Sequence, residues 1–274
     1  MDEHLEIIAS EVWKGHVALE IGISDQDLSS TVTPGSCFIF ASRMSYLAVI
    51  AADVIDHLRS FAIELVPVVW FEYNGIPLKS NLPVGVLFDL FHPHAVRSSW
   101  KITVRFRDFP EDQILHCCTR ENAEKHFMHS LKQALHSLHG STRSFNAINT
   151  EDQSAVWECC NSGNRQGYEC VAKGVRSCSK ELVRSIPIRF LFVSAQVQVI
   201  TVQKPCRAFV DEARSQVATL KNVLEQIAPS ICLEDHEVVV QGIVIPLESP
   251  VYDLWLSLAH ADFYLYAIVQ EKTE

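Results

Sequence analysis

The chain has 274 residues, 48% of them apolar, so it can bury cores for two modest domains or one large one; this excludes a disordered or collagen-like protein. Lys and Arg total 23 against 33 Asp and Glu, and the formal charge of −10 argues against a nucleic-acid partner. The start, MDEHLEII, lacks the features of a signal peptide, and no apolar run reaches the roughly 20 residues that span a bilayer. We therefore expect a soluble, cytoplasmic protein.

Nine cysteines are present, an odd number that leaves at least one thiol unpaired. Their spacing resembles no disulfide framework, and the sequence contains no CxxC pair of the kind that zinc sites use. We expect no metal and no other cofactor.

The first half begins with a helical pattern over its first dozen residues and continues with alternating apolar residues. The pattern predicts, in chain order, strands at 16–24 and 36–42, a helix at 47–61, a strand at 68–75 that ends in Asn-Gly, a short apolar segment at 83–91 and a strand at 101–106.

The second half repeats this order. It predicts two strands within 186–203, a helix at 217–227, a strand at 237–242, a short helix at 251–258 and a strand at 263–269. The segment that begins at Gly75, GIPL, has a loose echo in GIVIPL, which begins at Gly242.

Two strands, one helix and further strands are the order of a β-grasp domain, in which a mixed sheet wraps one helix. Residues between the two repeats show helical periodicity instead. We therefore predict an α+β protein in which two ubiquitin-like domains, at 15–109 and 185–274, flank a helix-rich domain at 110–184 and follow an N-terminal helix at 1–14.

The clearest helix of the middle region is predicted at 120–139, with Gly140 as its stop. A helical wheel puts Lys132 at the border between two faces: an apolar face of Phe127, Leu131, Ala134, Leu135 and Leu138, and a polar face of His129, Gln133 and His136. Lys132 is either an amine nucleophile that attacks a thioester or an ordinary solvated lysine, and the pattern alone favours the solvated lysine.

Four histidines on this helix suggest a second hypothesis, a metal-dependent enzyme. They are spaced as two i, i+3 pairs, but no carboxylate shares their face: His126, His129, His136 and His139. Cys117 and Cys118 follow His116, yet neighbours in sequence are badly placed for a Cys/His catalytic pair.

Apolar aromatic segments at the predicted domain edges exceed what a small β-grasp core needs. They contain Phe88, Leu90 and Phe91 in the first half and Leu254 and Trp255 in the second. They are either core residues or the lining of a groove for an amphipathic helix, and in the latter case the chain is a peptide-binding module.

Several ordered motifs resemble the autophagy protein 5 family across essentially the whole chain. They are RMSYL (43–47), WFEYNGIPLK (70–79), PVGVLFDL (83–90), WKITVRFRDFPEDQILHC (100–117), HFMHSLKQA (126–134) and IPIRF (186–190). The resemblance implies the same two ubiquitin-like domains around a helix-rich domain. It also implies a protein that is not itself a catalyst.

In this family the lysine of the HFM-x-x-x-K motif, which is Lys132 here, forms an isopeptide bond with the ubiquitin-like modifier autophagy protein 12. The resemblance implies that autophagy proteins 7 and 10 activate and transfer the modifier, and that the groove residues receive the N-terminal helix of autophagy protein 16. Through the conjugating enzyme autophagy protein 3, the assembly then promotes transfer of autophagy protein 8 to phosphatidylethanolamine on the phagophore membrane, to which it is recruited peripherally.

The chain departs from the family pattern mainly over residues 141–185 and 191–214, and Gln133 stands where many members carry an acid. Thr150 and Gln153 still predict a capping box and therefore one helix there. Contact with lipid would need a local cluster of basic residues. There are two candidates: Lys101 with Arg105 and Arg107, and Lys173 with Arg176 and Lys180. Each of them is either a lipid-binding cluster or an ordinary solvated surface.

Overall fold

The structure is a computed structural model that describes residues 3–29, 32–63, 69–91, 99–176, 182–193, 199–211 and 213–272. The chain divides into two compact units, which we describe separately. The first unit comprises Lys14–Phe127 with Asn161–Gly163. The second comprises Met1–Trp13, Met128–Cys160 and Asn164–Glu274.

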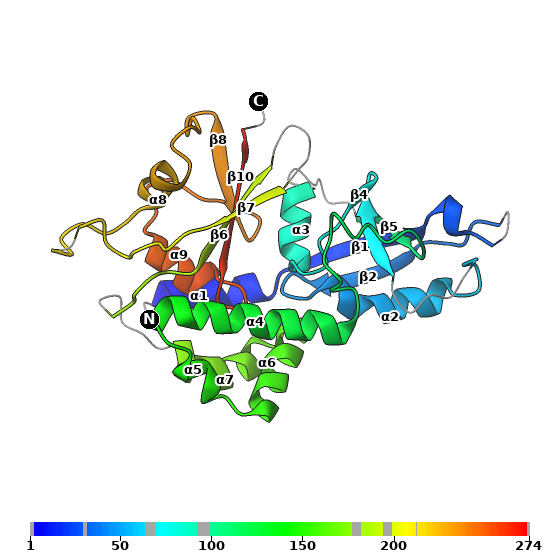
Figure 1. Ribbon diagram of the computed structural model, residues 1–274, viewed down its shortest axis with the longest axis horizontal. Helices are drawn as coiled ribbons and strands as arrows, with labels where there is room; N and C mark the ends of the chain where they lie inside the picture. Colours follow the sequence, from blue (N-terminus) through cyan, green and yellow to red (C-terminus); the bar gives the residue numbers. More distant parts are fainter. Residues whose placement is uncertain are drawn as a thin grey trace. The chain divides into compact units, whose positions relative to one another are not determined.

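The first unit contains a five-stranded sheet in the order β2-β1-β5-β3-β4. Its strands are β1 (His16–Ile23), β2 (Cys37–Ser42), β3 (Trp70–Tyr73), β4 (Ile76–Pro77) and β5 (Trp100–Arg105). The central pair β1 and β5 is parallel and the other neighbours are antiparallel. Helix α2 (Leu47–Leu58) lies along this sheet (Figure 1) and buries one stripe, whereas the short helix α3 (Val84–Phe91) precedes β5.

The second unit repeats this architecture in the order β7-β6-β10-β8-β9. Its strands are β6 (Ile188–Val193), β7 (Val199–Gln203), β8 (His236–Val240), β9 (Ile243–Val244) and β10 (Leu265–Glu271). Again the central pair, β6 and β10, is parallel. Helices α8 (Leu220–Ile227) and α9 (Val251–Leu258) take the places of α2 and α3. The predicted duplicated β-grasp order is thus confirmed.

The same turn closes a hairpin in each sheet. Asn74 and Gly75 have φ values of 51° and 78° between β3 and β4, and Gln241 and Gly242 have values of 53° and 76° between β8 and β9. Positive φ at both central residues is the geometry of a type I′ hairpin turn, which glycine adopts without strain. The sequence echo at Gly75 and Gly242 therefore marks equivalent turns.

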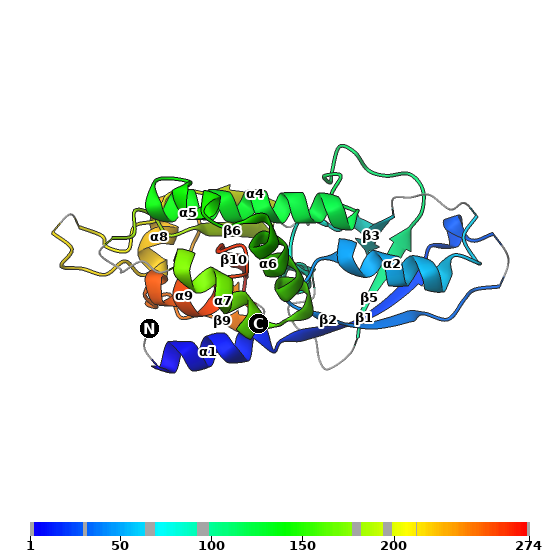
Figure 2. The same ribbon diagram turned by 90° about the horizontal axis from the view of Figure 1, so that it is seen from below.

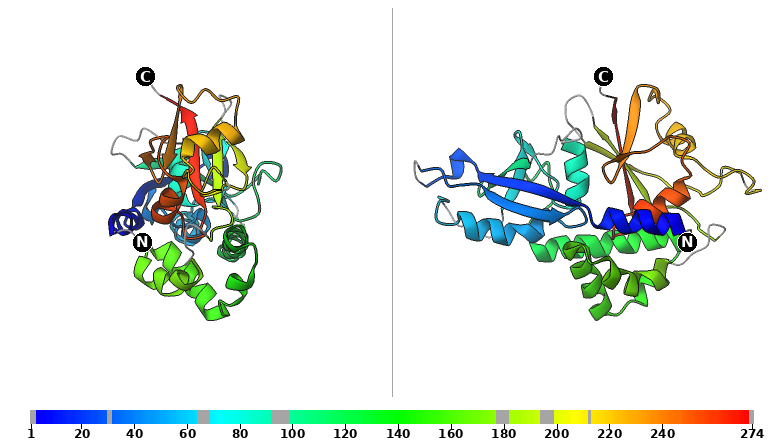
Figure 3. Two further views of the ribbon diagram at one scale, coloured as in Figure 1. Left: turned by 90° about the vertical axis from the view of Figure 1, so that its left-hand side faces the viewer. Right: turned by 180° about the vertical axis from the view of Figure 1, so that it is seen from behind.

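Further helices of the second unit are α1 (Glu3–Trp13), α5 (Arg143–Asn146), α6 (Thr150–Ser162, which ends in the first unit) and α7 (Arg165–Arg176). The long helix α4 (Arg120–His139) begins in the first unit and continues into the second from Met128. Helix α1 runs beside α9 (Figures 2 and 3). The Trp13 and Tyr168 ring centroids are 4.6 Å apart, and the Tyr168 hydroxyl donates to Ala261 O over 2.9 Å. Both residues are buried, so α1 and α7 share the core of the β-grasp domain.

Two local predictions were wrong. Thr150 does not cap α6: the side chain of Asn149 accepts from the Asp152 N–H over 2.8 Å and takes that role. The helix predicted from residue 217 begins at Leu220, because Val217 forms an extended bridge with Phe209 and Thr219 caps the helix.

Within the described residues, no helix is both long and apolar enough to cross a membrane.

Candidate functional site

Helix α4 (Arg120–His139) carries Lys132 on its exposed side. Leu131, Leu135 and Leu138 are buried on the apolar face, whereas His129, Gln133 and His136 are exposed and Lys132 lies between these two sets. This distribution confirms the predicted wheel. Lys132 therefore presents its amine to solvent from a helix whose other face is fixed in a core.

The amine of Lys132 lies over an aromatic ring. Its Nζ is 5.7 Å from the centroid of Phe145, a buried residue of α5. A cation–π contact of this kind contributes about 0.5–1 kcal/mol at an exposed site. No described carboxylate lies within ion-pair distance of Lys132, so the side chain is positioned weakly and stays accessible.

Arg189 on β6 connects the sheet of the second unit to α4. Its guanidinium donates to the hydroxyl of Ser130 over 3.3 Å and to Oε1 of Gln133 over 3.4 Å. Nε2 of Gln133 in turn lies 2.9 Å from Nε2 of His129. Ser130 lies two residues before Lys132 and Gln133 lies one residue after it. Arg189 therefore fixes the rotation of the helical turn that carries the lysine.

A buried polar network holds Arg189 in place. The guanidinium stacks 3.7 Å above the ring centroid of Tyr264, donates to the Tyr266 hydroxyl over 2.9 Å and lies 3.8 Å from Asp262. The Tyr266 hydroxyl donates to Asp262 over 2.7 Å. Such a network is rigid only while every member is satisfied.

The charges of this network follow from its surroundings. Burial raises the pKa of Asp262, and the Arg189 guanidinium opposes that rise. Burial also raises the pKa of Tyr266 well above its ordinary value, so this hydroxyl keeps its proton and acts as a donor. Burial alone would lower the pKa of Arg189, but Tyr266 and Asp262 outweigh it and raise that pKa.

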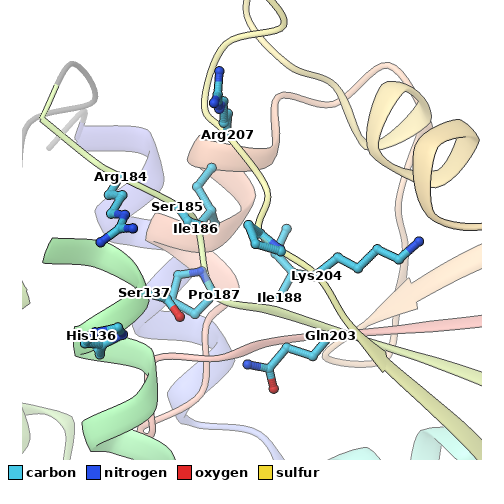
Figure 4. Close-up of a pocket in the computed structure, with 11 residues that line it drawn as sticks. His136, Ser137, Arg184, Ser185, Ile186, Pro187, Ile188, Gln203, Lys204 and Arg207 are labelled. Atoms are coloured by element: carbon cyan, nitrogen blue, oxygen red, sulfur yellow. The ribbon is translucent and has the colours of Figure 1, made fainter. Parts of the chain in front are cut away.

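The end of α4 borders a cavity of about 410 Å³ (Figure 4). It lies wholly within the second unit, and it is lined by His136, Ser137, Arg184, Ser185, Ile186, Pro187, Ile188, Gln203, Lys204, Pro205 and Arg207. None of these residues is acidic. The backbone N–H of Arg184 donates to Leu138 O over 2.9 Å and ties this segment to α4.

The four helix histidines do not come together as a ligand set. His126 lies 3.4 Å from the side-chain amide of Asn81, and His139 lies 3.0 Å from Val175 O. In the part of the chain that the structure describes, no group of three or more His, Cys, Asp or Glu side chains is arranged to hold a metal ion. The metal-enzyme hypothesis gains no structural support.

The paired cysteines are poor nucleophiles. Cys117 and Cys118 are buried, and burial raises the pKa of both thiols. His116 points elsewhere, since its ring stacks on Phe109 with a centroid distance of 4.1 Å. Among the described residues, each cysteine is a free thiol.

The predicted groove residues fall in both units. Leu90, Leu254 and Trp255 are buried, and Trp255 Nε1 donates to Phe263 O over 2.8 Å, so these three serve the cores. Phe88 and Phe91 on α3 are only half-buried. A groove built from both sets stays a prediction.

One basic cluster is smaller than predicted. Lys101 is exposed, but Arg105 is largely buried and pairs with Asp27 over 3.0 Å, which removes it from any lipid surface. Lys173 is exposed, while the side chains of Arg176 and Lys180 lie outside the described residues.

Sequence reasoning missed the role of Arg189. The available signal was a charged residue inside the apolar strand IPIRFLFV, because a charge at such a position needs a partner. Asp262 and the two tyrosines are remote in sequence, so no local pattern could identify that partner.

Comparison with known proteins agrees with this architecture. Residues 12–106 match the family model described as "Autophagy protein ATG5, UblA domain". Residues 120–175 and 185–269 match the models of the alpha-helical bundle region and the UblB domain of the same protein. The chain belongs to the autophagy protein 5 family. Both the predicted family and the predicted fold class are thereby confirmed.

Relatives in this family are distant in sequence. Autophagy protein 5 of Oryza sativa subsp. indica is 28% identical over 232 residues, which cover 84% of this chain and 60% of that protein. The chain therefore spans only 60% of the length of the rice relative. Autophagy protein 5 of Debaryomyces hansenii is 24% identical over 289 residues, which cover 97% of this chain and 96% of the relative.

The crystal structure of Kluyveromyces marxianus Atg5 superposes with a TM-score of 0.81 at 24% identity. The match covers 97% of this chain and all of that chain. At this level of identity the likeness establishes a shared fold.

Proposed function

We propose that this chain is a non-catalytic autophagy scaffold to which the ubiquitin-like modifier autophagy protein 12 is joined through Lys132. The observation that carries the proposal is the placement of Lys132: an exposed amine without a carboxylate partner among the described residues, on a helix held by Arg189. Family membership supports the choice of modifier.

The proposed bond forms by aminolysis of a thioester. The ammonium of Lys132 first loses one proton, because only the neutral amine is nucleophilic. Nζ then attacks the carbonyl carbon of the modifier's C-terminal glycine, which a cysteine of the conjugating enzyme holds as a thioester. The C–N bond forms, the C–S bond breaks, and the leaving thiolate takes up the second proton that the nitrogen releases.

The proposal includes the rest of the assembly. Autophagy protein 7 activates the modifier and autophagy protein 10 transfers it. The conjugate binds the N-terminal helix of autophagy protein 16 and, with autophagy protein 3, promotes attachment of autophagy protein 8 to phosphatidylethanolamine. We place the protein in the cytoplasm, with peripheral recruitment to the phagophore membrane.

Reconstituted conjugation with the modifier, both enzymes and ATP tests this proposal. Wild type should give a shifted band on a denaturing gel, and Lys132→Arg should give none, because the guanidinium keeps the charge but is not a nucleophile. Lys125→Arg on the same helix is the matched control and should conjugate like wild type, since Lys125 is exposed and pairs with Glu121. Full conjugation of Lys132→Arg would show that another lysine is the acceptor.

A second candidate function is a helix-binding module that is never conjugated. The half-buried rings of Phe88 and Phe91 favour it, because they leave apolar surface for a partner. Binding of a peptide with the N-terminal helix of autophagy protein 16, together with no conjugation of wild type under any condition, would support this candidate instead.

A further inference from the structure

Acidic residues are absent from two segments of an otherwise acidic chain. The chain carries 33 Asp and Glu, yet none occurs between residues 126 and 149 or between residues 182 and 210. The first segment contains Lys132, and the second contains Arg184, Arg189, Lys204 and Arg207.

The fold brings these two segments together around the cavity at the end of α4. His136 and Ser137 contribute from the first segment, and the remaining lining residues all come from the second. Figure 4 shows Arg184 and His136 on one side of the opening, and Lys204 and Arg207 on the chain that runs along the other. His136 follows Lys132 by four residues on α4, so the cavity begins within one helical turn of the position that carries the acceptor lysine.

The cations at this cavity lack internal partners. Arg184, Lys204 and Arg207 are exposed, and none of them pairs with a carboxylate within the described residues. Two exposed lysines elsewhere in the chain do have such partners. Lys101 lies 3.4 Å from Glu20, and Lys221 lies 3.7 Å from Glu248. Within the described residues, no carboxylate neutralises the positive charge at the cavity, and a surface of this kind attracts anions.

We infer that the surface made by Lys132, His136, Arg184, Lys204 and Arg207, here called the acceptor surface, docks an acidic face of the conjugating enzyme that delivers the modifier. This inference rests on the proposed function. Aminolysis requires the thioester carbon to come within about 3–3.5 Å of Nζ, so the enzyme must contact the protein surface around Lys132. Complementary charge there raises the rate of encounter and sets the orientation of the enzyme.

The test compares two double variants with the same change in net charge. Lys204→Glu with Arg207→Glu alters the acceptor surface, and Lys101→Glu with Lys272→Glu is the control at exposed lysines outside it. Arg184 stays intact, because its side chain packs against Gly140 at the end of α4 and a change there could disturb folding.

The measured quantity is the initial rate of conjugation against the concentration of thioester-charged autophagy protein 10, at low and high salt. We expect the acceptor-surface variant to raise the half-saturating concentration at least about tenfold at low salt, with a near-normal maximal rate. High salt should shrink this difference, because the Debye length falls to about 3 Å at 1 M. The control should match wild type.

An unchanged half-saturating concentration, with Lys132→Arg still inactive, would overturn the inference and leave the proposed function standing. If wild type itself forms no conjugate, the proposed function fails, and a binding titration with uncharged autophagy protein 10 then decides the inference: equal affinity of both double variants overturns it. Loss of flotation with anionic phosphatidylserine vesicles, at unchanged affinity for the enzyme, would also overturn it in favour of a lipid surface.

Discussion

Each of the two units buries an aspartate beside an arginine of its sheet, Asp27 beside Arg105 and Asp262 beside Arg189, but the two arginines make different further contacts. In the first unit Asp27 accepts from Nε of Arg105 and from the Phe106 N–H, each over 3.0 Å, and from Nε of Arg107 over 3.4 Å. All of these donors belong to the end of β5 and the residues that follow it. The network therefore joins the residues after β1 to the end of β5, within the same unit.

In the second unit the arginine reaches out of the sheet. Arg189 lies between two tyrosines, Tyr264 just before β10 and Tyr266 on it, and two side chains of α4, which are Ser130 and Gln133. The same fold therefore uses a buried arginine in two ways. In the first unit the arginine holds the end of its own strand, and in the second unit it holds the helix that carries Lys132. The β-grasp topology therefore sets the arrangement of the strands, whereas the polar residues on them determine which other elements each sheet holds in place.

Removal of Arg189 should give the largest effect. Arg189→Ala leaves Asp262 buried without its cation and frees α4, so we expect a loss of roughly 3–5 kcal/mol in the free energy of unfolding, measured with urea. Hydrogen exchange should speed up at residues 130–138 in particular, because the α4 contacts are lost.

Arg189→Lys is the control for that variant. Lysine keeps the positive charge near Asp262, but it lacks the planar guanidinium that donates to several acceptors at once. It should therefore recover part of the stability and little of the protection of α4 from hydrogen exchange. Protection of α4 that stays unchanged in Arg189→Ala would show that apolar packing alone holds the helix.

A change in the buried network of the first unit should have a smaller effect. Asp27→Asn removes the charge but keeps one oxygen acceptor, and Arg105 retains Glu72 at 3.3 Å. We expect a loss of about 1–3 kcal/mol, with faster hydrogen exchange confined to Lys14–Phe127. Increased exchange in α4 beyond Met128 would contradict the view that this network serves its own sheet.

Periodicity predicted the parts of the structure that local sequence determines. The strands around Val17 and Val239, the stripe of α2 and the exposed side of Lys132 all follow from the spacing of apolar residues. Motif resemblance then predicted the family. The sequence also placed the stop of α4 at Gly140.

The rest depends on contacts between residues remote in sequence. Arg189, Asp262 and Ser130 come from three different elements, and the cavity joins residues around 136, 186 and 206. No window of the sequence contains these sets, so propensity and spacing carry no information about them. The same reason explains why Trp255 could be assigned to a core or to a groove until its burial was known.

The duplicated turn gives the finest test of the comparison. Gly75→Ala and Gly242→Ala each force an alanine into positive φ, at 78° and 76°, and should cost about 1–2 kcal/mol in thermal or urea unfolding. At Gly75 no atom lies within 4 Å of an added Cβ, so backbone strain alone acts there. Gly174→Ala within α7 is the control, because that site is equally open and helical, and it should stabilise by about 0.5–1 kcal/mol. A gain in stability at only one of the two turns would show that the two hairpins are not equivalent.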